Sequence, residues 1–321
     1  MIEYNKEEGI APIIAMLLIL AVIVTVMSVY FNTYVPSLKE EAEIDHLSNV
    51  EKEFLSFSSD LENAVWQKSE GRLSRSLVLG GGDVFLSSVK SGGILKVQED
   101  ARLFNITNST GIIYNSSFVK FSYEPVSNFW QDQGYSWQYG YVSLTTGYNV
   151  TTPLQYTDMN DTIQSVENDS GIFKSLFDIE YMYNLVFEKD DKGNYTGNRF
   201  LNCTEVTLTI ASLEKGEKDY VSGNGVAMPS LETDIEKISF NETQLNFSVN
   251  NDVLMGVNNT IWECINEKLV DFNSSQFDNV EIVSCYPDAT DDDIGKDLDI
   301  LFIDPVKVNI KQVKLTVSAK V

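Results

Sequence analysis

The residues able to do acid–base or nucleophilic chemistry are few and scattered in this chain of 321 residues. The only histidine, His46, stands among acidic neighbours, where a surface residue is commoner than a ligand or a general base. With one histidine and no G-x-S-x-G sequence, no Ser-His-Asp or Cys-His arrangement is evident. A pair of carboxylates that cleaves a glycosidic bond remains an alternative, although no local sequence pattern marks such a pair. We therefore expect no enzyme, no catalytic residues and no cofactor.

The cysteines predict one disulfide at most. Cys203, Cys264 and Cys285 form no CxxC pair, and with a single histidine they supply no ligand set for a structural zinc ion, so we expect no metal site. We expect a bond between Cys264 and Cys285, because a helix and the strand after it can meet across the intervening loop, although spacing does not determine connectivity. The third thiol would be buried or bridged between chains.

Two short motifs suggest a ligand, but each has a simpler interpretation. "YPDATDDDIGKDLD" holds carboxylates of the kind that calcium binds, yet it lacks the residue order and the closing Glu of an EF-hand, so a solvated turn is favoured. Gly80–Gly82 lack the following helix and Lys-Ser/Thr of a phosphate-binding loop and predict a turn. The aspartates of the first motif are Asp288, Asp291, Asp292, Asp293 and Asp297.

The stretch "NFWQDQGYSWQYGYVSL" concentrates aromatic residues near amides, as a carbohydrate-binding surface does. Four of them alternate with a period of two, which predicts one face of one strand and favours packing in a half-buried core over sugar binding. The aromatic residues are Phe129, Trp130, Tyr135, Trp137, Tyr139 and Tyr141, and the last four alternate.

Acceptor signals for N-linked sugars are frequent, with twelve N-x-S/T sequences against roughly four expected by chance. Asn108 and Asn115, beside turn residues, are the strongest candidates. None precedes the apolar segment described next, so the large C-terminal part is expected to be extracellular and glycosylated. The sites are Asn105, Asn108, Asn115, Asn149, Asn160, Asn168, Asn194, Asn202, Asn241, Asn246, Asn258 and Asn273.

The first structural feature of the chain that carries these groups is an uncharged run of 22 residues, 10–31. As a helix it spans about 33 Å, enough for a hydrocarbon core of roughly 30 Å. The run is too long, and the leader too acidic, for an ordinary secretory signal. We predict a single-pass transmembrane helix at the cell membrane. The basic residues nearest its two ends, Lys6 and Lys39, leave its orientation undecided by charge.

The next segment, residues 32–71, predicts an amphipathic stalk helix. One apolar face recurs at intervals of mostly three or four residues, Pro36 can bend the helix at its start, and Gly71 can end it. A helix half in the membrane and half packed on a globular head would result. The face comprises Leu38, Ala42, Leu47, Val50, Phe54, Phe57, Leu61 and Val65.

Residues 72–321 predict a β-rich extracellular domain, either undivided or in two subdomains. The period changes to two, and Val, Ile, Phe, Tyr and Thr dominate runs such as "EVTLTIASL" and "VKVNIKQVKLTVSAKV". One late helix, "NTIWECINEKLVDF", presents Trp262 and Ile265 on one face and should pack on the β core. The predicted fold class is mainly β: a transmembrane and stalk helix, then an antiparallel, sandwich-like head with this late helix.

The charge balance excludes one class of partner. With 47 acidic against 23 basic residues the net charge is −24, so nucleic acid is a poor partner. Solubility explains the excess of acidic residues more simply than a specific acidic recognition site does.

The N-terminal stretch "EEGIAPIIAMLLILAVIVTVMSVYF" resembles that of archaeal type IV pilin-like proteins, in which a short leader ends in Gly before an uncharged helix. The resemblance implies a leader of residues 1–9, cut by a prepilin-type peptidase after Gly9, with Ile10 as the mature terminus of a helix that packs with like subunits. Glu8 departs from the basic residue usual before that Gly. "LVLGGGDVFL" and "GNGVAMPSLE" also look like large archaeal surface proteins of this type, which bring no established activity.

Two classes of function therefore compete. The first is a membrane-anchored archaeal cell-surface protein of pilin-like type, structural or adhesive, including a filament subunit, whose partners are membrane lipid, like subunits and a surface glycan or envelope protein. The alternative is a surface-anchored carbohydrate-binding module or a hydrolase acting on polysaccharide, with Trp130 and Trp137 in its platform. An exposed row of these aromatics beside a cleft with two carboxylates would favour the alternative.

Overall fold

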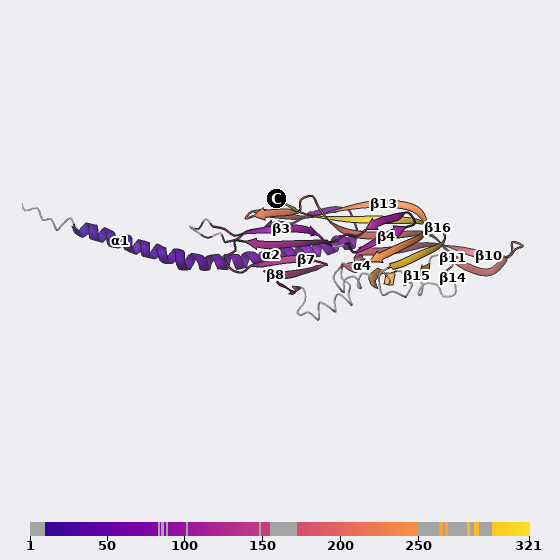
Figure 1. The fold of residues 1–321 in the computed structure, drawn as a ribbon, viewed down its shortest axis with the longest axis horizontal. Helices are drawn as coiled ribbons and strands as arrows, with labels where there is room; N and C mark the ends of the chain where they lie inside the picture. Colours follow the sequence, from indigo (N-terminus) through magenta and orange to yellow (C-terminus); the bar gives the residue numbers. More distant parts are fainter. Residues whose placement is uncertain are drawn as a thin grey trace, which may run out of the picture.

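The computed structural model describes residues 10–82, 84, 87, 89–100, 102–147, 149–154, 172–249, 263–265, 267–268, 281–282, 286–288 and 297–321. The molecule is elongated. A long helix projects from one end of a β head, and the hairpin of β10 (Phe177–Lys189) and β11 (Tyr195–Lys215) forms the opposite end (Figure 1). The mainly β fold class with an N-terminal apolar helix is confirmed.

The helix has three parts: α1 (Ile10–Val29), a short π-helix η1 (Tyr30–Tyr34) and α2 (Val35–Gln67). It ends where Lys68 adopts a left-handed backbone with φ 48° and donates its N–H to the Ala64 carbonyl over 3.1 Å. A residue in this conformation satisfies one of the last carbonyl groups of a helix. The stalk helix therefore stops four residues before Gly71, where the sequence predicted its end.

The π-helix marks the boundary between the two helical regions. The Val35 N–H bonds to the Tyr30 carbonyl, five residues back, and Pro36 follows at the start of α2. Proline has no N–H and its ring crowds the carbonyl four residues before it, so the regular α-helical pattern cannot continue through it. The irregularity expected near Pro36 thus lies in the turn that precedes it.

Within the described residues, the larger sheet has ten strands in the central order β10-β11-β16-β13-β4-β5, and β1, β2, β14 and β15 pair along its sides. Its additional strands are β1 (Gly71–Ser74), β2 (Leu77–Val78), β4 (Phe104–Asn108), β5 (Gly111–Asn115), β13 (Val226–Val249), β14 (Glu281–Ile282), β15 (Tyr286–Asp288) and β16 (Asp297–Lys320). The smaller sheet has six strands in the order β12-β3-β6-β7-β8-β9. They are β3 (Gly92–Glu99), β6 (Val119–Val126), β7 (Gln133–Gln138), β8 (Tyr141–Thr146), β9 (Asn149–Pro153) and β12 (Tyr220–Gly223).

One long strand pair departs from the predicted antiparallel head. β16 is antiparallel to β13 but parallel to β11, with Glu205 opposite Lys307 and Lys215 opposite Val317. β11 and β13 run in opposite directions, so any strand between them must be parallel to one of the two. The sheet is therefore mixed.

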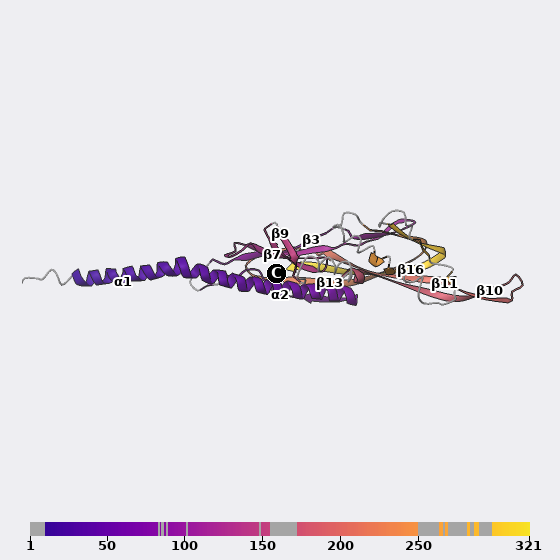
Figure 2. The same ribbon diagram turned by 90° about the horizontal axis from the view of Figure 1, so that it is seen from below.

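A single hydrophobic core joins α2 to both sheets. α2 lies along one side of the head, with the strands on its other side (Figure 2). Ring contacts connect the layers: the Phe54 and Phe121 rings stack at 4.8 Å, and Phe57 lies 5.1 Å from Phe121. The late helix is described at residues 263–265 and 267–268, where Cys264 and Ile265 are buried, as its packing on the β core predicts. Trp262 lies outside the described residues. A short helix, α4 (Phe173–Leu176), was not predicted.

Candidate functional site

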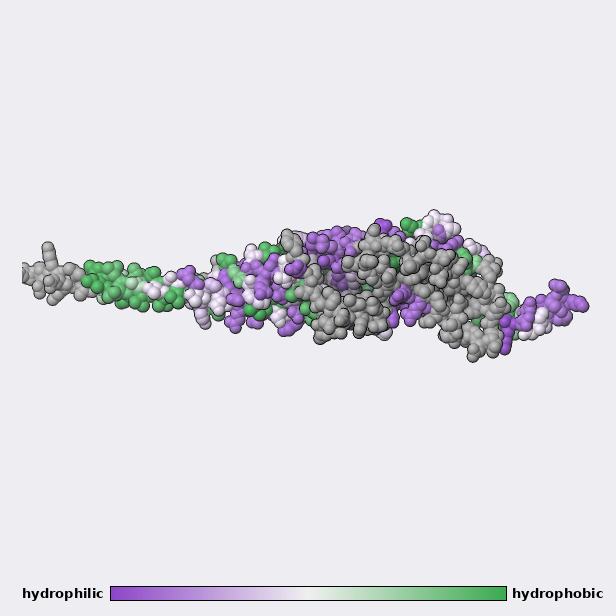
Figure 3. Space-filling view, turned by 60° about the horizontal axis from the view of Figure 1, so that its bottom comes forward, coloured by the Kyte–Doolittle hydropathy of each residue, from purple (hydrophilic) through white to green (hydrophobic). Residues whose placement is uncertain are grey.

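The first candidate site is the surface of α1. Its side chains from Ile13 to Val29 carry no charge, and its large apolar ones are 46–75% exposed. Figure 3 shows the visible face of α1 as hydrophobic along most of its length, whereas the far tip of the head is hydrophilic. The helix is long and apolar enough to cross a membrane, and none of its most apolar window is buried by the head.

The few polar side chains of this region are satisfied within the helix. The Thr25 hydroxyl donates to the Ala21 carbonyl over 2.7 Å, and the Asn32 amide donates to the Ser28 carbonyl over 2.9 Å. Such bonds to the preceding turn remove the cost of exposing a polar group to hydrocarbon. The surface of α1 is therefore suited to an apolar environment over its whole circumference.

The second candidate site is a polar cluster at the start of the buried face of α2. Lys39, Glu43 and His46 are 6%, 0% and 8% exposed. They replace Leu38 and Ala42, the predicted start of the buried face, which are only half-buried. The sequence held a signal for their burial. Going back along the chain from Leu47 in steps of one, three and four residues reaches His46, Glu43 and Lys39, which therefore lie on the same side of the helix.

The prediction of a surface His46 is wrong. Its Nε2 lies 3.1 Å from the Tyr123 hydroxyl, which donates to the Leu79 carbonyl over 2.9 Å. Nε2 therefore serves as the donor to Tyr123. Burial lowers the pKa of His46, and the charge of Glu43 opposes that shift. Burial also raises the pKa of Tyr123, which keeps its hydroxyl proton available to Leu79.

Among the described residues, no carboxylate lies within hydrogen-bonding distance of the His46 ring. Both carboxylate oxygens of Glu43 are buried, and they have no hydrogen-bond partner in the described part of the chain. The Lys39 ammonium donates instead to the Val89 carbonyl over 2.8 Å and lies 4.2 Å from the centre of the Phe129 ring. A buried carboxylate without a partner costs free energy of folding, so this cluster is a weakly stabilised part of the contact between helix and head.

Glycines let the head approach this cluster. A Cβ on Gly81 would lie 2.8 Å from the His46 Cβ, and one on Gly82 would lie 2.8 Å from the Phe129 ring. Gly82 also has φ +74°, which side chains rarely permit. The triplet therefore fits closely against α2, and the turn expected there stays a prediction. A groove of about 550 Å³ beside it is lined by residues that include His46, Asp45, Glu53 and Gly80.

The aromatic stretch turns inward. Tyr135 and Trp137 in β7 are 1% and 0% exposed, and the Trp137 Nε1 donates to the Ser58 hydroxyl of α2 over 3.0 Å. Structural packing, the favoured interpretation, accounts for both. The single predicted strand is wrong, because Tyr139 and Gly140 have φ 54° and 89° and form the turn between β7 and β8. Positive φ at both positions is what a two-residue hairpin turn requires.

The described sequon asparagines fall into two groups. Asn115, Asn149, Asn194 and Asn241 are exposed, and Asn105, Asn108, Asn202 and Asn246 are half-buried. The side-chain nitrogen of Asn108 donates to Glu242 over 2.6 Å, and that of Asn246 donates to Asp299 over 2.9 Å. A sugar on either nitrogen would have to displace these bonds. Asn160, Asn168, Asn258 and Asn273 lie outside the described residues, as do Gly9 and the rest of the leader.

The cysteines require a correction. Cys203 takes part in a disulfide bond, whereas Cys264 has a buried thiol, so the bridge predicted between Cys264 and Cys285 is not formed. The third thiol was expected to be buried or bridged between chains, and Cys264 is buried. Cys285 lies outside the described residues. Spacing alone could not identify Cys203, because its place in the sheet depends on strand pairing far along the chain.

The described residues hold no group of three or more His, Cys, Asp or Glu side chains placed to bind a metal ion. Of the acidic loop, only Asp288 and Asp297 are described, at the end of β15 and the start of β16. Asp291, Asp292 and Asp293 lie outside the described part, so the prediction of a solvated turn stays untested.

Comparison with known proteins adds no relative: no family model, no curated protein and no solved structure matches this chain. The candidate sites therefore rest on their own geometry.

Proposed function

We propose that this chain is a membrane-anchored cell-surface protein of pilin-like type, in which α1 is the anchor and the β head is a structural or adhesive domain outside the cell. The observation that carries the proposal is the contrast along one helix. α1 is apolar and exposed on all sides, and α2, directly after it, is buried along one face of the head. A sleeve of exposed apolar side chains is unfavourable in water and needs lipid or like helices around it.

The archaeal pilin-like resemblance supplies the finer part of the proposal. Cleavage after Gly9 would leave Ile10 as the N-terminus and remove three glutamates that are costly to bury. The shortened helix could then move from lipid into a filament core made of the same apolar faces. Pro12 fits the first turn of such a helix, where no hydrogen bond of its nitrogen is lost.

Glycosylation of the head is part of the same proposal. The exposed Asn115, Asn149 and Asn241 are the sites we expect to be occupied first, because their amides stand in solvent. Asn194 is also exposed, but its side-chain nitrogen donates to the Asp190 carboxylate over 3.3 Å. Asn108 and Asn246 should be occupied less, since their amides bond to carboxylates within the fold.

The polysaccharide-acting alternative gains no specific support. Tyr135 and Trp137 are fully buried, and Trp130, at 38%, is the only clearly exposed aromatic side chain of the described stretch.

Membrane fractionation tests the proposal. The full-length protein should stay in the membrane after carbonate or high-salt washing and need detergent for release, whereas a variant lacking residues 10–31 should be soluble with a folded head. Release of the full-length protein by carbonate would overturn the anchor. Intact-mass and N-terminal analysis of the native protein then tests the finer claims: a terminus at Ile10 supports cleavage, Met1 or Ile2 refutes it, and the bare polypeptide mass refutes glycosylation.

A further inference from the structure

The end of the head nearest α1 reaches almost to the end of the apolar segment. Val35, four residues after Phe31, is only 6% exposed, so the head already covers the helix there. Four residues of helix rise about 6 Å. The headgroup layer on each side of a bilayer is about 5–8 Å thick, from the difference between total and hydrocarbon thickness. If α1 spans the membrane, this end of the head lies at the level of the headgroups.

Two loops of the head lie there because Lys39 holds them. Its ammonium bonds to the Val89 carbonyl and lies over the Phe129 ring. Side chains on a helix lean toward its N-terminus, so the Lys39 ammonium lies closer to α1 than the Lys39 backbone does. Val89 and Phe129, which contact this ammonium, therefore lie closer to α1 as well. The first belongs to the segment before β3, and the second to the turn between β6 and β7.

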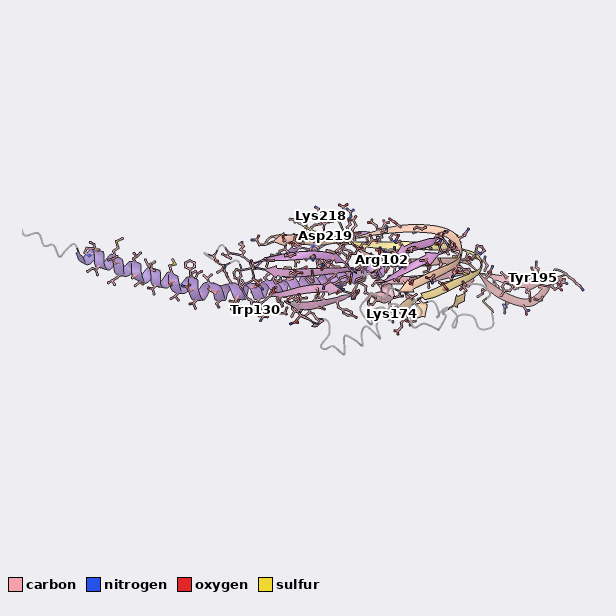
Figure 4. All side chains as sticks on the ribbon, in the orientation of Figure 1. Arg102, Trp130, Lys174, Tyr195, Lys218 and Asp219 are labelled. Atoms are coloured by element: carbon pink, nitrogen blue, oxygen red, sulfur yellow. The ribbon has the colours of Figure 1, made fainter. Side chains whose placement is uncertain are left out.

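At this end, exposed polar residues such as Lys90, Ser127 and Gln131 are accompanied by four exposed side chains that are apolar or aromatic. We call these four the near rim: Tyr34 on the helix, Val89 before β3, Val126 at the end of β6, and Trp130 in the β6–β7 turn, with exposures of 58%, 58%, 42% and 38%. Of the residues labelled in Figure 4, Trp130 lies nearest to α1, and Tyr195 lies at the opposite end. Tryptophan and tyrosine are enriched where membrane meets water, because their rings are apolar and their polar atoms can stay hydrated.

We propose that the near rim rests on the headgroup layer of the membrane that α1 spans, as a second and interfacial contact. The inference rests on the proposed function, because it needs α1 in the bilayer. The occupant is lipid rather than a second copy because the rim stands at the height set by Val35, next to the end of the apolar surface of α1, and the exposed Phe31 and Tyr34 lie between the two. The consequence is a fixed tilt of the head, despite the irregular helix at Tyr30–Tyr34.

Spin labelling of the full-length protein tests the contact. We would place a nitroxide at Val89→Cys or Trp130→Cys, one at a time, in discs that hold one protein copy, without reductant. Leu185→Cys, 46% exposed on β10 at the far end, is the matched control, and Val22→Cys reports α1. The readout is collision of the label with oxygen, which partitions into lipid, and with a water-soluble nickel chelate.

We expect the Val22 label to be reached by oxygen alone. The Val89 and Trp130 labels should lose several-fold of the nickel collisions that the Leu185 label shows, and regain them when the protein is moved from discs to a small detergent micelle that leaves the head in water. Nickel access equal to that at Leu185, with Val22 still in lipid, would overturn the rim contact and leave the anchor intact. Nickel access at Val22 would overturn the anchor itself. Protection that appears only in vesicles with many copies would assign the rim to a neighbouring chain and overturn the lipid contact.

Discussion

α1 and α2 are one nearly continuous helix with opposite exposure, and the difference indicates what kind of environment each half needs. α1 exposes its apolar side chains on every side, whereas α2 buries one stripe of them, from Leu47 to Val65, against the sheets. A helix that is apolar all around needs an apolar solvent, and a helix with one apolar face needs one partner surface. The boundary falls at η1 and Pro36, where the backbone pattern changes as well.

The largest expected effect breaks the packing of α2. Phe57→Ala should lower the free energy of unfolding of the head by about 3–5 kcal/mol, because it empties a fully buried site against Phe121. Leu20→Ala in α1, where the side chain is 56% exposed, should leave that free energy unchanged. Denaturant unfolding of both variants in detergent, followed by tryptophan fluorescence, measures the difference. Equal losses in the two variants would show that α1 also packs on the head.

The next effect breaks the apolar character of α1. Leu20→Arg places a charge near the middle of the helix, which costs about 2.5–3.5 kcal/mol of membrane insertion. We expect a large fraction of this variant to leave the membrane pellet after carbonate washing. Asn49→Arg, on the exposed side of α2, is the control and should be retained like the unmodified protein. Full retention of Leu20→Arg would mean that lipid is not what surrounds α1.

This contrast between the two halves is also where the sequence was most informative. The uncharged run and the three-to-four spacing of Leu47 to Val65 are local patterns, and they predicted both helices and most of the buried face of α2. Strands with a period of two, such as β11 and β16, were equally readable. Local periodicity reports which side of an element is buried, because burial of one face is what selects the pattern.

Features that depend on distant segments were not predictable. His46 was expected on the surface because its sequence neighbours are acidic, but Gly81 and Tyr123 bury it from other parts of the chain. The parallel pairing of β11 with β16, and the disulfide of Cys203, are set by strand order. The turn at Tyr139 was missed because alternation of aromatics outweighed the signal of Gly140, although a glycine between two aromatic runs can mark a hairpin.

A third prediction sharpens the comparison within α2, between its apolar stripe and its polar cluster. Glu43→Leu should raise the free energy of unfolding by about 1–3 kcal/mol, because it removes a buried carboxylate that has no hydrogen-bond partner among the described residues. Its control is Glu40→Leu, an exposed carboxylate one turn away, where we expect a change within about 0.5 kcal/mol. Both are measured by denaturant unfolding at neutral pH. Destabilisation by Glu43→Leu would show that the carboxylate is needed, and that the cluster is not weak.

The smallest predicted effect is a pH dependence that α2 has and α1 lacks. Burial lowers the pKa of His46 in the folded protein below its ordinary 6.5, so between these two pKa values the unfolded chain binds more protons than the folded one. Stability from this residue is therefore complete above about pH 6.5 and is lost as the pH falls toward the lowered pKa. His46→Gln should remove this component, so its unfolding free energy should fall less than that of the unmodified protein between pH 8 and 5. Glu43 raises the pKa of His46, so Glu43→Leu should instead steepen the loss of unfolding free energy as the pH falls.

Retention of the full-length protein in membranes should not change over the same pH range, because Ile10–Val29 carry no titratable side chain. Parallel pH profiles for His46→Gln and the unmodified protein would mean that the ionisation of His46 does not contribute to the pH dependence of stability.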